Sequence, residues 1–300
     1  MKENPVKENR KFELLKLLIK IIITAVCFWY ISGKIDFSEA WKALQSANWL
    51  FLVIALIAFV ISKLLSAFRL NIYFKNAGVN LPDFQSIKLY WLGMFYNLFL
   101  PGSISGDAYK VVLLKRKINI PYKKTTTAVL LDRFSGLLGN GLILAVYSIF
   151  VVKKSVYITG IIAAAILAVI IFYYITYRWL KDFIPGFLPT LLFGIIVQAF
   201  QVISVYFIMS ALGIPAQVTE YIFIFLISSV VAVLPLTIGG LGARELVFFE
   251  GSRYFGLAQE PSVIISLLFY LITVITSAVG LFYVFNDPLR DNKKDVFTRS

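Results

Sequence analysis

The feature that most constrains this chain is a series of long, predominantly apolar runs separated by short charged stretches. A helix rises 1.5 Å per residue, so about 20 apolar residues cross the hydrocarbon core of a bilayer. Because lipid offers the backbone no hydrogen-bond partners, such runs must be helical. We therefore predict an all-α, polytopic integral membrane protein with about six full transmembrane helices. The expected spans are 14–32, 49–68, 126–150, 156–177, 189–212 and 262–285.

Composition excludes several other classes of protein. Hydrophobic residues make up 59% of the 300 residues and charged residues 15%, which is far more apolar than a soluble domain requires. The chain has no His, a single Cys and no nucleotide-binding loop, so we predict no metal site, disulfide, histidine-based triad or cofactor. The net charge of +13 fits basic cytoplasmic loops beside anionic headgroups, and we do not expect nucleic acid as a partner.

Two further apolar segments, 87–100 and 220–234, are too short to cross a bilayer. Each ends at a proline with glycines behind it, and each is followed by a second short helix, 105–115 or 241–256. Broken backbone at membrane depth is tolerated only where protein or a polar cavity covers it. We therefore predict two re-entrant helix pairs, with a conventional count of about eight spans as the alternative.

The distribution of Lys and Arg favours the re-entrant arrangement. Basic residues cluster in both tails, after the second span, after the first short pair and after the fourth span. If each short pair enters and leaves on one side, the positive-inside rule places these clusters in the cytoplasm, with Lys153 and Lys154 as exceptions. We expect a protein of the cytoplasmic membrane with cytoplasmic tails at 1–13 and 286–300.

The two interrupted segments resemble each other. The first reads PGSISGDAYK from Pro101 and the second PLTIGGLGAR from Pro235, which aligns Lys110 with Arg244. Together with the opposite orientation of the two pairs, this predicts an inverted repeat, in which interrupted segments at corresponding positions mark the substrate site. The expected single membrane domain covers 1–300, with half-repeats at 14–150 and 156–285.

A helix that begins inside a membrane leaves its first N–H groups without partners, so an anion is its natural ligand. Lys110 and Arg244 are our first candidates for contacting a phosphate, with snorkelling or structural ion pairing as alternatives. Asp107 and Glu245 lie in the first turns, where helix capping explains them equally well, and Ser105 is another cap candidate. Glycines would let a phosphate approach the backbone closely. They are Gly102, Gly106, Gly239, Gly240 and Gly242.

Asp132 and Arg133 lie near the start of an apolar span, and a charge at the centre of a membrane helix costs about 2.5 to 3.5 kcal/mol. Neighbouring residues on a helix point about 100° apart, so the two have different partners. One arrangement pairs Asp132 with Lys110 or Arg244 and leaves Arg133 for substrate or Asp107. A purely structural role at the membrane interface is the alternative. Hydrogen bonds between helices explain three further polar residues, Asn97, Gln198 and Gln201.

Three segments carry a family resemblance: LPGSISGDAYKVVLLKR at 100–116, LLDRFSGLL at 130–138 and LPLTIGGLGARELVFF at 234–249. In this order they resemble the membrane domain of lysylphosphatidylglycerol synthase, which is shared with archaeal dolichyl-phosphate glucosyltransferases and is often described as flippase-like. The family usually has two glycines where this chain has Ser105 and Gly106, which weakens the case for close backbone approach there. It often has Glu-Arg where this chain has Asp132 and Arg133.

The resemblance implies a role with membrane lipids, because in bifunctional relatives this domain moves an aminoacylated phospholipid between leaflets. We expect translocation of an anionic phospholipid or lipid-linked phosphate, without aminoacyl transfer, since only about 15 residues follow Phe285. One alternative is an integral-membrane transferase that uses Asp107, Asp132 or Glu245 as acid or base. Another is a non-catalytic membrane partner of a separate lipid-modifying enzyme. The sequence pattern carries no information about whether the protein is a monomer or an oligomer.

Overall fold

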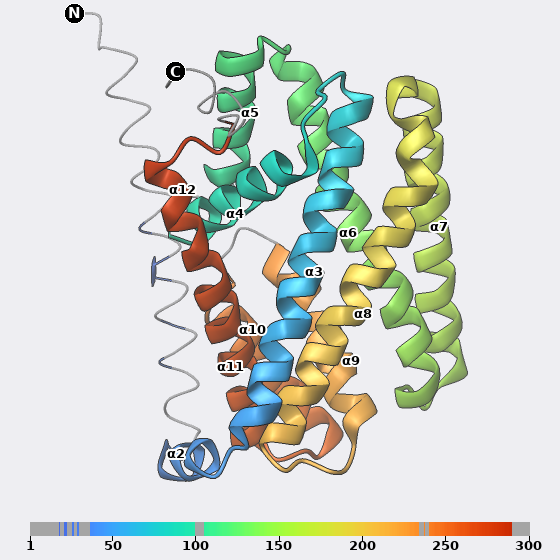
Figure 1. The fold of residues 1–300 in the computed structure, drawn as a ribbon. Helices are drawn as coiled ribbons and strands as arrows, with labels where there is room; N and C mark the ends of the chain where they lie inside the picture. Colours follow the sequence, from blue (N-terminus) through green and yellow to red (C-terminus); the bar gives the residue numbers. More distant parts are fainter. Residues whose placement is uncertain are drawn as a thin grey trace, which may run out of the picture.

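The computed structural model of the chain describes residues 37–99, 105–233, 237 and 240–289, together with isolated positions between 18 and 29 (Figure 1). The first predicted span and the N-terminal tail therefore lie almost entirely outside the described residues, as does the C-terminal tail from 290. The same holds for the prolines of the two interrupted turns and for two of their glycines, Gly102 and Gly239.

The part of the chain that the structure describes contains five helices long and apolar enough to cross a membrane. These match the five predicted spans that fall within it, so the chain is an all-α, polytopic membrane protein. They are α3 (Trp49–Asn76), α6 (Tyr122–Val151), α7 (Ser155–Trp179), α8 (Phe187–Ala211) with the preceding 3₁₀ turn η1 (Lys181–Gly186), and α11 (Gln259–Ala278), continued through η2 (Val279–Leu281) into α12 (Phe282–Phe285).

The short apolar segments form two helical hairpins, and a further short helix precedes α3. The first hairpin consists of α4 (Asp83–Phe99) and α5 (Ser105–Ile118), and the second of α9 (Val218–Val233) and α10 (Ala243–Phe255). α10 begins where Gly242 adopts a φ of +83°, a conformation that suits glycine. The further helix, α2 (Phe37–Gln45), has no counterpart among the predicted elements.

The two hairpins lie in opposite halves of the bundle. In Figure 1, α4 and α5 occupy the upper half and α9 and α10 the lower half, while the long helices run between the two ends. Ion pairs between side chains tie the upper ends together: Lys75 with Asp83 at 3.8 Å, Lys117 with Asp287 at 2.6 Å and Lys124 with Asp182 at 3.1 Å. The outer ends of α4 and α5 therefore both lie at the end of the bundle where α6 begins and α12 terminates.

Glycines allow the helices around the bundle centre to approach closely. A Cβ atom on Gly106 would lie 1.9 Å from the carbonyl oxygen of Gly93, so α5 lies directly against the backbone of α4. A Cβ on Gly139 of α6 would lie 2.4 Å from the carbonyl carbon of Gly194 in α8. Small residues at such crossings are typical of membrane helices, where packing rather than water exclusion drives association.

Aromatic residues fill the core of the lower half. Phe225 of α9 packs edge-on against Phe269 of α11, with ring centroids 4.8 Å apart, and Phe59 of α3 packs against the same ring at 5.3 Å. By contrast, none of the most apolar 18-residue window of α7 is buried within the protein. α7 therefore presents an apolar surface suited to lipid, and the polar residues gather elsewhere.

Candidate functional site

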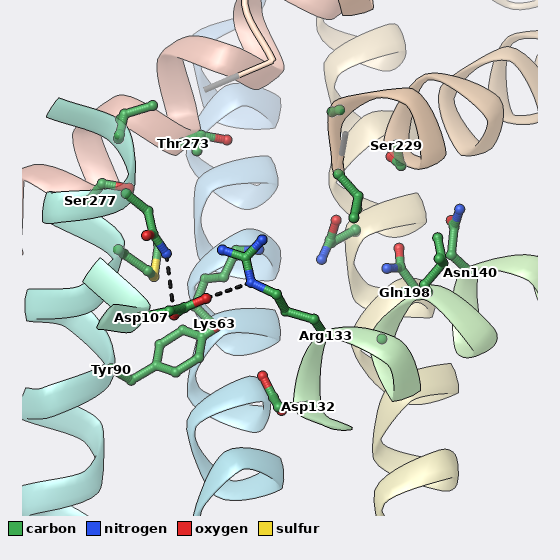
Figure 2. A pocket seen from close by; sticks show the side chains of 18 of the residues that line it. Lys63, Tyr90, Asp107, Asp132, Arg133, Asn140, Gln198, Ser229, Thr273 and Ser277 are labelled. Atoms are coloured by element: carbon green, nitrogen blue, oxygen red, sulfur yellow. Dashed lines mark hydrogen bonds and ion pairs between the residues drawn. The ribbon is translucent and has the colours of Figure 1, made fainter. Parts of the chain in front are cut away.

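A cavity of about 340 Å³ lies between the two halves of the chain (Figure 2). Helices α3, α4, α5 and α6 of the first half and α8, α9, α10 and α11 of the second half all contribute side chains to its lining. A central cavity lined by both halves is the arrangement in which transporters with repeated halves hold their substrates.

Charged side chains dominate one part of the lining. Among the described residues that line the cavity, five are basic and two are acidic, which gives a formal charge of +3 when all are ionised. Buried charges in a bundle of apolar helices are unfavourable unless they pair or meet a ligand of opposite charge. The basic residues are Lys63, Arg69, Lys110, Arg133 and Arg244, and the acidic residues are Asp107 and Asp132.

Asp107 is the acceptor for two cations. Lys110 donates from Nζ to one carboxylate oxygen of Asp107 at 2.8 Å, and Arg133 donates from Nε to the other at 2.5 Å. Asp107 is 6% exposed and Lys110 is 4% exposed, so this pair is shielded from solvent, whereas the side chain of Arg133 is 30% exposed. Figure 2 shows the contact between α5 and α6 that results. Asp107 was one of the two partners predicted for Arg133, and this pairing is confirmed.

Asp132 pairs with Arg69, a residue that was not predicted to belong to the site. Arg69 donates from Nε to Asp132 at 2.7 Å and joins α3 to α6. The prediction that Asp132 pairs with Lys110 or Arg244 was therefore wrong. α3 continues past the apolar run and carries Arg69 against α6, where Gly136 leaves room for it: a Cβ there would lie 3.0 Å from Nη1 of Arg69.

Arg244 and Lys63 are the basic residues of the lining that form no ion pair within the described residues. The guanidinium of Arg244 lies over the rings of Phe225 and Phe269, 5.8 and 5.0 Å from the ring centroids. Within the described part of the chain it forms no ion pair, and its Nη1 is buried without a hydrogen-bond partner. Nη1 of Arg69 is also buried without a partner there. Two guanidinium groups, one from each half, therefore retain unused donors at the cavity.

In the first interrupted turn, the described groups are engaged within the protein. Ser105 donates from Oγ to the carbonyl of Tyr96 at 2.6 Å, and the amide of Gly106 donates to Oδ1 of Asn97 at 2.9 Å. Asn97 therefore performs the capping that the sequence suggested for Ser105 or Asp107. Gly106 serves the close packing of α5 on α4.

The second interrupted turn is held by Glu245. One carboxylate oxygen of Glu245 accepts the amide N–H of Gly242 at 2.6 Å, and the other accepts the hydroxyl of Ser266 at 2.8 Å. Glu245 is fully buried and forms the N-terminal cap of α10. Gly240, at φ +84°, accepts a hydrogen bond from the amide of Arg244 and so begins the turn that directs Arg244 inward.

Comparison with known proteins agrees with this architecture. The sequence model of the lysylphosphatidylglycerol synthase TM region matches residues 17–192 and 181–280. The chain belongs to this family. It is 25% identical over 169 residues to a UPF0104 membrane protein of Archaeoglobus fulgidus, an alignment that covers 56% of this chain and 50% of the relative. A UPF0104 membrane protein of Pyrococcus horikoshii is 27% identical over 121 residues, which cover 40% of this chain and 35% of the relative. The chain thus spans half or less of the curated relatives it matches.

Two basic residues at the cavity of this family member were missed as site candidates, Lys63 and Arg69. Lys63 lies within a predicted span, and its Nζ is 4.5 Å from the centroid of Phe59. The signal that could have found it is a charge inside an apolar run, because ionisable residues in membrane helices are usually functional. Arg69 directly follows the second predicted span. It was used only as one of the basic residues that assign this end of the span to the cytoplasm.

The arrangement suits anion binding better than acid–base chemistry. Asp107 and Asp132 are both neutralised by neighbouring cations, and Glu245 is occupied as a helix cap. Among the described residues that line the cavity, basic side chains outnumber carboxylates, and two guanidiniums have a donor without a partner. Guanidinium groups bind phosphate oxygens with charge-assisted hydrogen bonds. A phosphate group is therefore the chemistry that this cavity complements best.

Proposed function

We propose that this protein moves an anionic phospholipid or a lipid-linked phosphate between the two leaflets, with the headgroup passing through the central cavity. The observation that carries the proposal is the positive charge of that cavity inside a bundle of apolar helices. An anionic headgroup would supply the missing negative charge and accept hydrogen bonds from Nη1 of Arg69 and Nη1 of Arg244.

The architecture supports a transport role through its two halves. We infer that the hairpins α4–α5 and α9–α10 are re-entrant and enter the membrane from opposite faces, as expected for an inverted repeat. Their position in opposite halves of the bundle favours this (Figure 1). Small movements of one half against the other would then open the shared cavity first to one leaflet and then to the other.

The distribution of basic residues favours one orientation of the protein in the cytoplasmic membrane. Basic residues gather at the end of the bundle where α5 terminates and α6 begins. Because basic loops are retained in the cytoplasm, we infer that this end faces the cytoplasm. The basic residues there lie in the end turns of helices: Lys75, Lys115, Arg116, Lys117, Lys123, Lys124, Arg178 and Lys181.

The test is leaflet transfer by the purified protein. Proteoliposomes with fluorescent phosphatidylglycerol in both leaflets are treated with dithionite, which bleaches only the outer leaflet, and transfer appears as additional bleaching. Arg244→Ala removes a charge-assisted contact worth about 1.5 to 3 kcal/mol, so transfer should slow about 10- to 150-fold.

Arg253→Ala is the matched control, because Arg253 lies on the same helix but is 65% exposed and paired only loosely with Glu250 at 3.9 Å. It should transfer lipid at the rate of the unaltered protein. Circular dichroism and gel filtration would verify that both variants are folded. Equal transfer by Arg244→Ala, Arg253→Ala and the unaltered protein would refute the role of the cavity.

A further inference from the structure

The side of the cavity away from the charged cluster is lined by uncharged polar side chains. Asn140 of α6, Gln198 of α8 and Ser229 of α9 converge there and are called the neutral wall. Figure 2 shows them across the cavity from Asp107, Tyr90 and Lys63. Three helices thus supply uncharged polar groups to one side of the cavity, opposite the charged cluster.

Each residue of the neutral wall has a buried polar atom without a partner among the described residues. These atoms are Oδ1 of Asn140, Oε1 of Gln198 and Oγ of Ser229. Asn140 is 2% exposed and Ser229 is 8% exposed. Nδ2 of Asn140 donates to the carbonyl of Leu226 at 3.0 Å, which fixes its amide so that Oδ1 is the free atom. Buried polar atoms are nearly always hydrogen-bonded, so these three atoms on one surface are hydrogen-bonding positions that a polar ligand can occupy.

The chemistry of these atoms restricts that ligand. Amide oxygens only accept hydrogen bonds, and a serine hydroxyl can both accept and donate, so the wall complements hydroxyl groups. A ligand ammonium group would require an uncompensated carboxylate, whereas Asp107 and Asp132 are already paired with three basic side chains. A further cation would also be repelled by a cavity with a formal charge of +3.

We propose that the neutral wall is a subsite for the hydroxyl groups of a polyol attached to the phosphate, either glycerol or a sugar. This proposal rests on the proposed function, since it assumes that the phosphate binds at the arginines. The substrate class is then a phospholipid or lipid phosphate whose headgroup carries hydroxyls. A headgroup with a free amine is disfavoured.

The experiment measures the binding of lipids with identical acyl chains to the full chain in neutral detergent by native mass spectrometry. Phosphatidylglycerol and phosphatidylinositol carry hydroxyls, phosphatidic acid carries phosphate alone, and phosphatidylethanolamine and lysylphosphatidylglycerol carry an amine. With two additional hydrogen bonds, a hydroxylated headgroup should bind about 10-fold more tightly than phosphatidic acid. Both amine-bearing lipids should bind more weakly than phosphatidylglycerol. The ratio between phosphatidylinositol and phosphatidylglycerol distinguishes a sugar-like from a glycerol headgroup.

Gln198→Leu and Ser229→Ala should lower the preference for phosphatidylglycerol over phosphatidic acid to about one- to threefold. Neither change removes a hydrogen bond within the described protein, so both variants should fold. Ser228→Ala is the matched control, because Ser228 is adjacent on α9 but donates to the carbonyl of Phe225 at 2.7 Å and does not line the cavity. It should keep the full preference.

Two outcomes would overturn the proposal. One is a preference for phosphatidylglycerol over phosphatidic acid that Gln198→Leu and Ser229→Ala leave intact. The other is equal affinity of the unaltered protein for both lipids, or tighter binding of an amine-bearing lipid. In each of these cases the proposed function survives if Arg244→Ala still weakens binding of every anionic lipid. The proposed function fails as well if Arg244→Ala has no effect on the binding of any anionic lipid.

Discussion

The paired carboxylate of Asp107 allows a quantitative test of the charge balance in the cavity. Asp107→Asn keeps the side-chain volume but leaves Lys110 and Arg133, which lie 2.8 and 2.5 Å from the carboxylate, without a counter-charge. Removing one partner from a buried ion pair destabilises proteins by about 3 to 5 kcal/mol. For a protein of this size this corresponds to a decrease in Tm of about 6 to 10 °C. The formal charge of the cavity would rise from +3 to +4.

The assay is thermal unfolding of the purified protein in neutral detergent, followed by intrinsic fluorescence. Asp182→Asn is the control, because it breaks an exposed ion pair with Lys124 at 3.1 Å. The Asp182 side chain is 60% exposed and the Lys124 side chain 48% exposed. Exposed pairs contribute about 0 to 1 kcal/mol, so its Tm should fall by no more than about 2 °C.

Anionic lipid provides a second measurement on the same pair of variants. Added phosphatidylglycerol should raise the Tm of Asp107→Asn more than that of the unaltered protein, because the unpaired cations gain an anion. The reasoning is refuted if Asp107→Asn and Asp182→Asn unfold at the same temperature, or if the lipid stabilises both equally.

Two substitutions outside the charged cluster test the packing of the hairpins. Glu245→Ala removes the cap of α10 and the bond from Ser266, so we expect a loss of about 1 to 3 kcal/mol and faster hydrogen exchange at the start of α10. Gly106→Ala places a Cβ 1.9 Å from the carbonyl oxygen of Gly93 and should cost about 1 to 3 kcal/mol, measured as a lower Tm. Gly141→Ala is the control, because its added Cβ would meet no atom within 4 Å, and it should not lower the Tm. Equal Tm values for the two glycine variants would contradict the packing role of Gly106.

The long helices were predictable because the bilayer imposes one length and one polarity on every span. Their ends were less so. α3 extends to Asn76, well beyond the expected end at 68, because its last turns contact protein instead of lipid: Asn71 donates to Asp83 of α4 at 2.7 Å. Such polar contacts carry no hydropathy signal. α2 was missed for a different reason: its nine residues are too few to stand out as a span.

The charged residues that line the cavity were easier to predict than their ion-pair partners, although Lys63 and Arg69 were missed. Asp107, Lys110, Asp132, Arg133 and Arg244 all line the cavity, because charges in or beside membrane segments are few and tend to face polar surroundings. Which charges pair depends on how closely the helices approach, and that distance is set by glycines and side-chain packing. The pairing of α3 with α6 through a guanidinium therefore emerged only from the structure.

Adjacent residues of α6 bind opposite charges on two different helices, and this fixes the rotation of α6 about its own axis. Asp132 faces Arg69 of α3, and Arg133 faces Asp107 of α5. Turning α6 by one residue, about 100°, would set Arg133 against Arg69 in one direction and Asp132 against Asp107 in the other. Both rotations bring like charges together. The two ion pairs therefore hold α6 in one rotational setting. Under the proposed function, a motion that opens the cavity is expected to tilt or shift α6 rather than turn it.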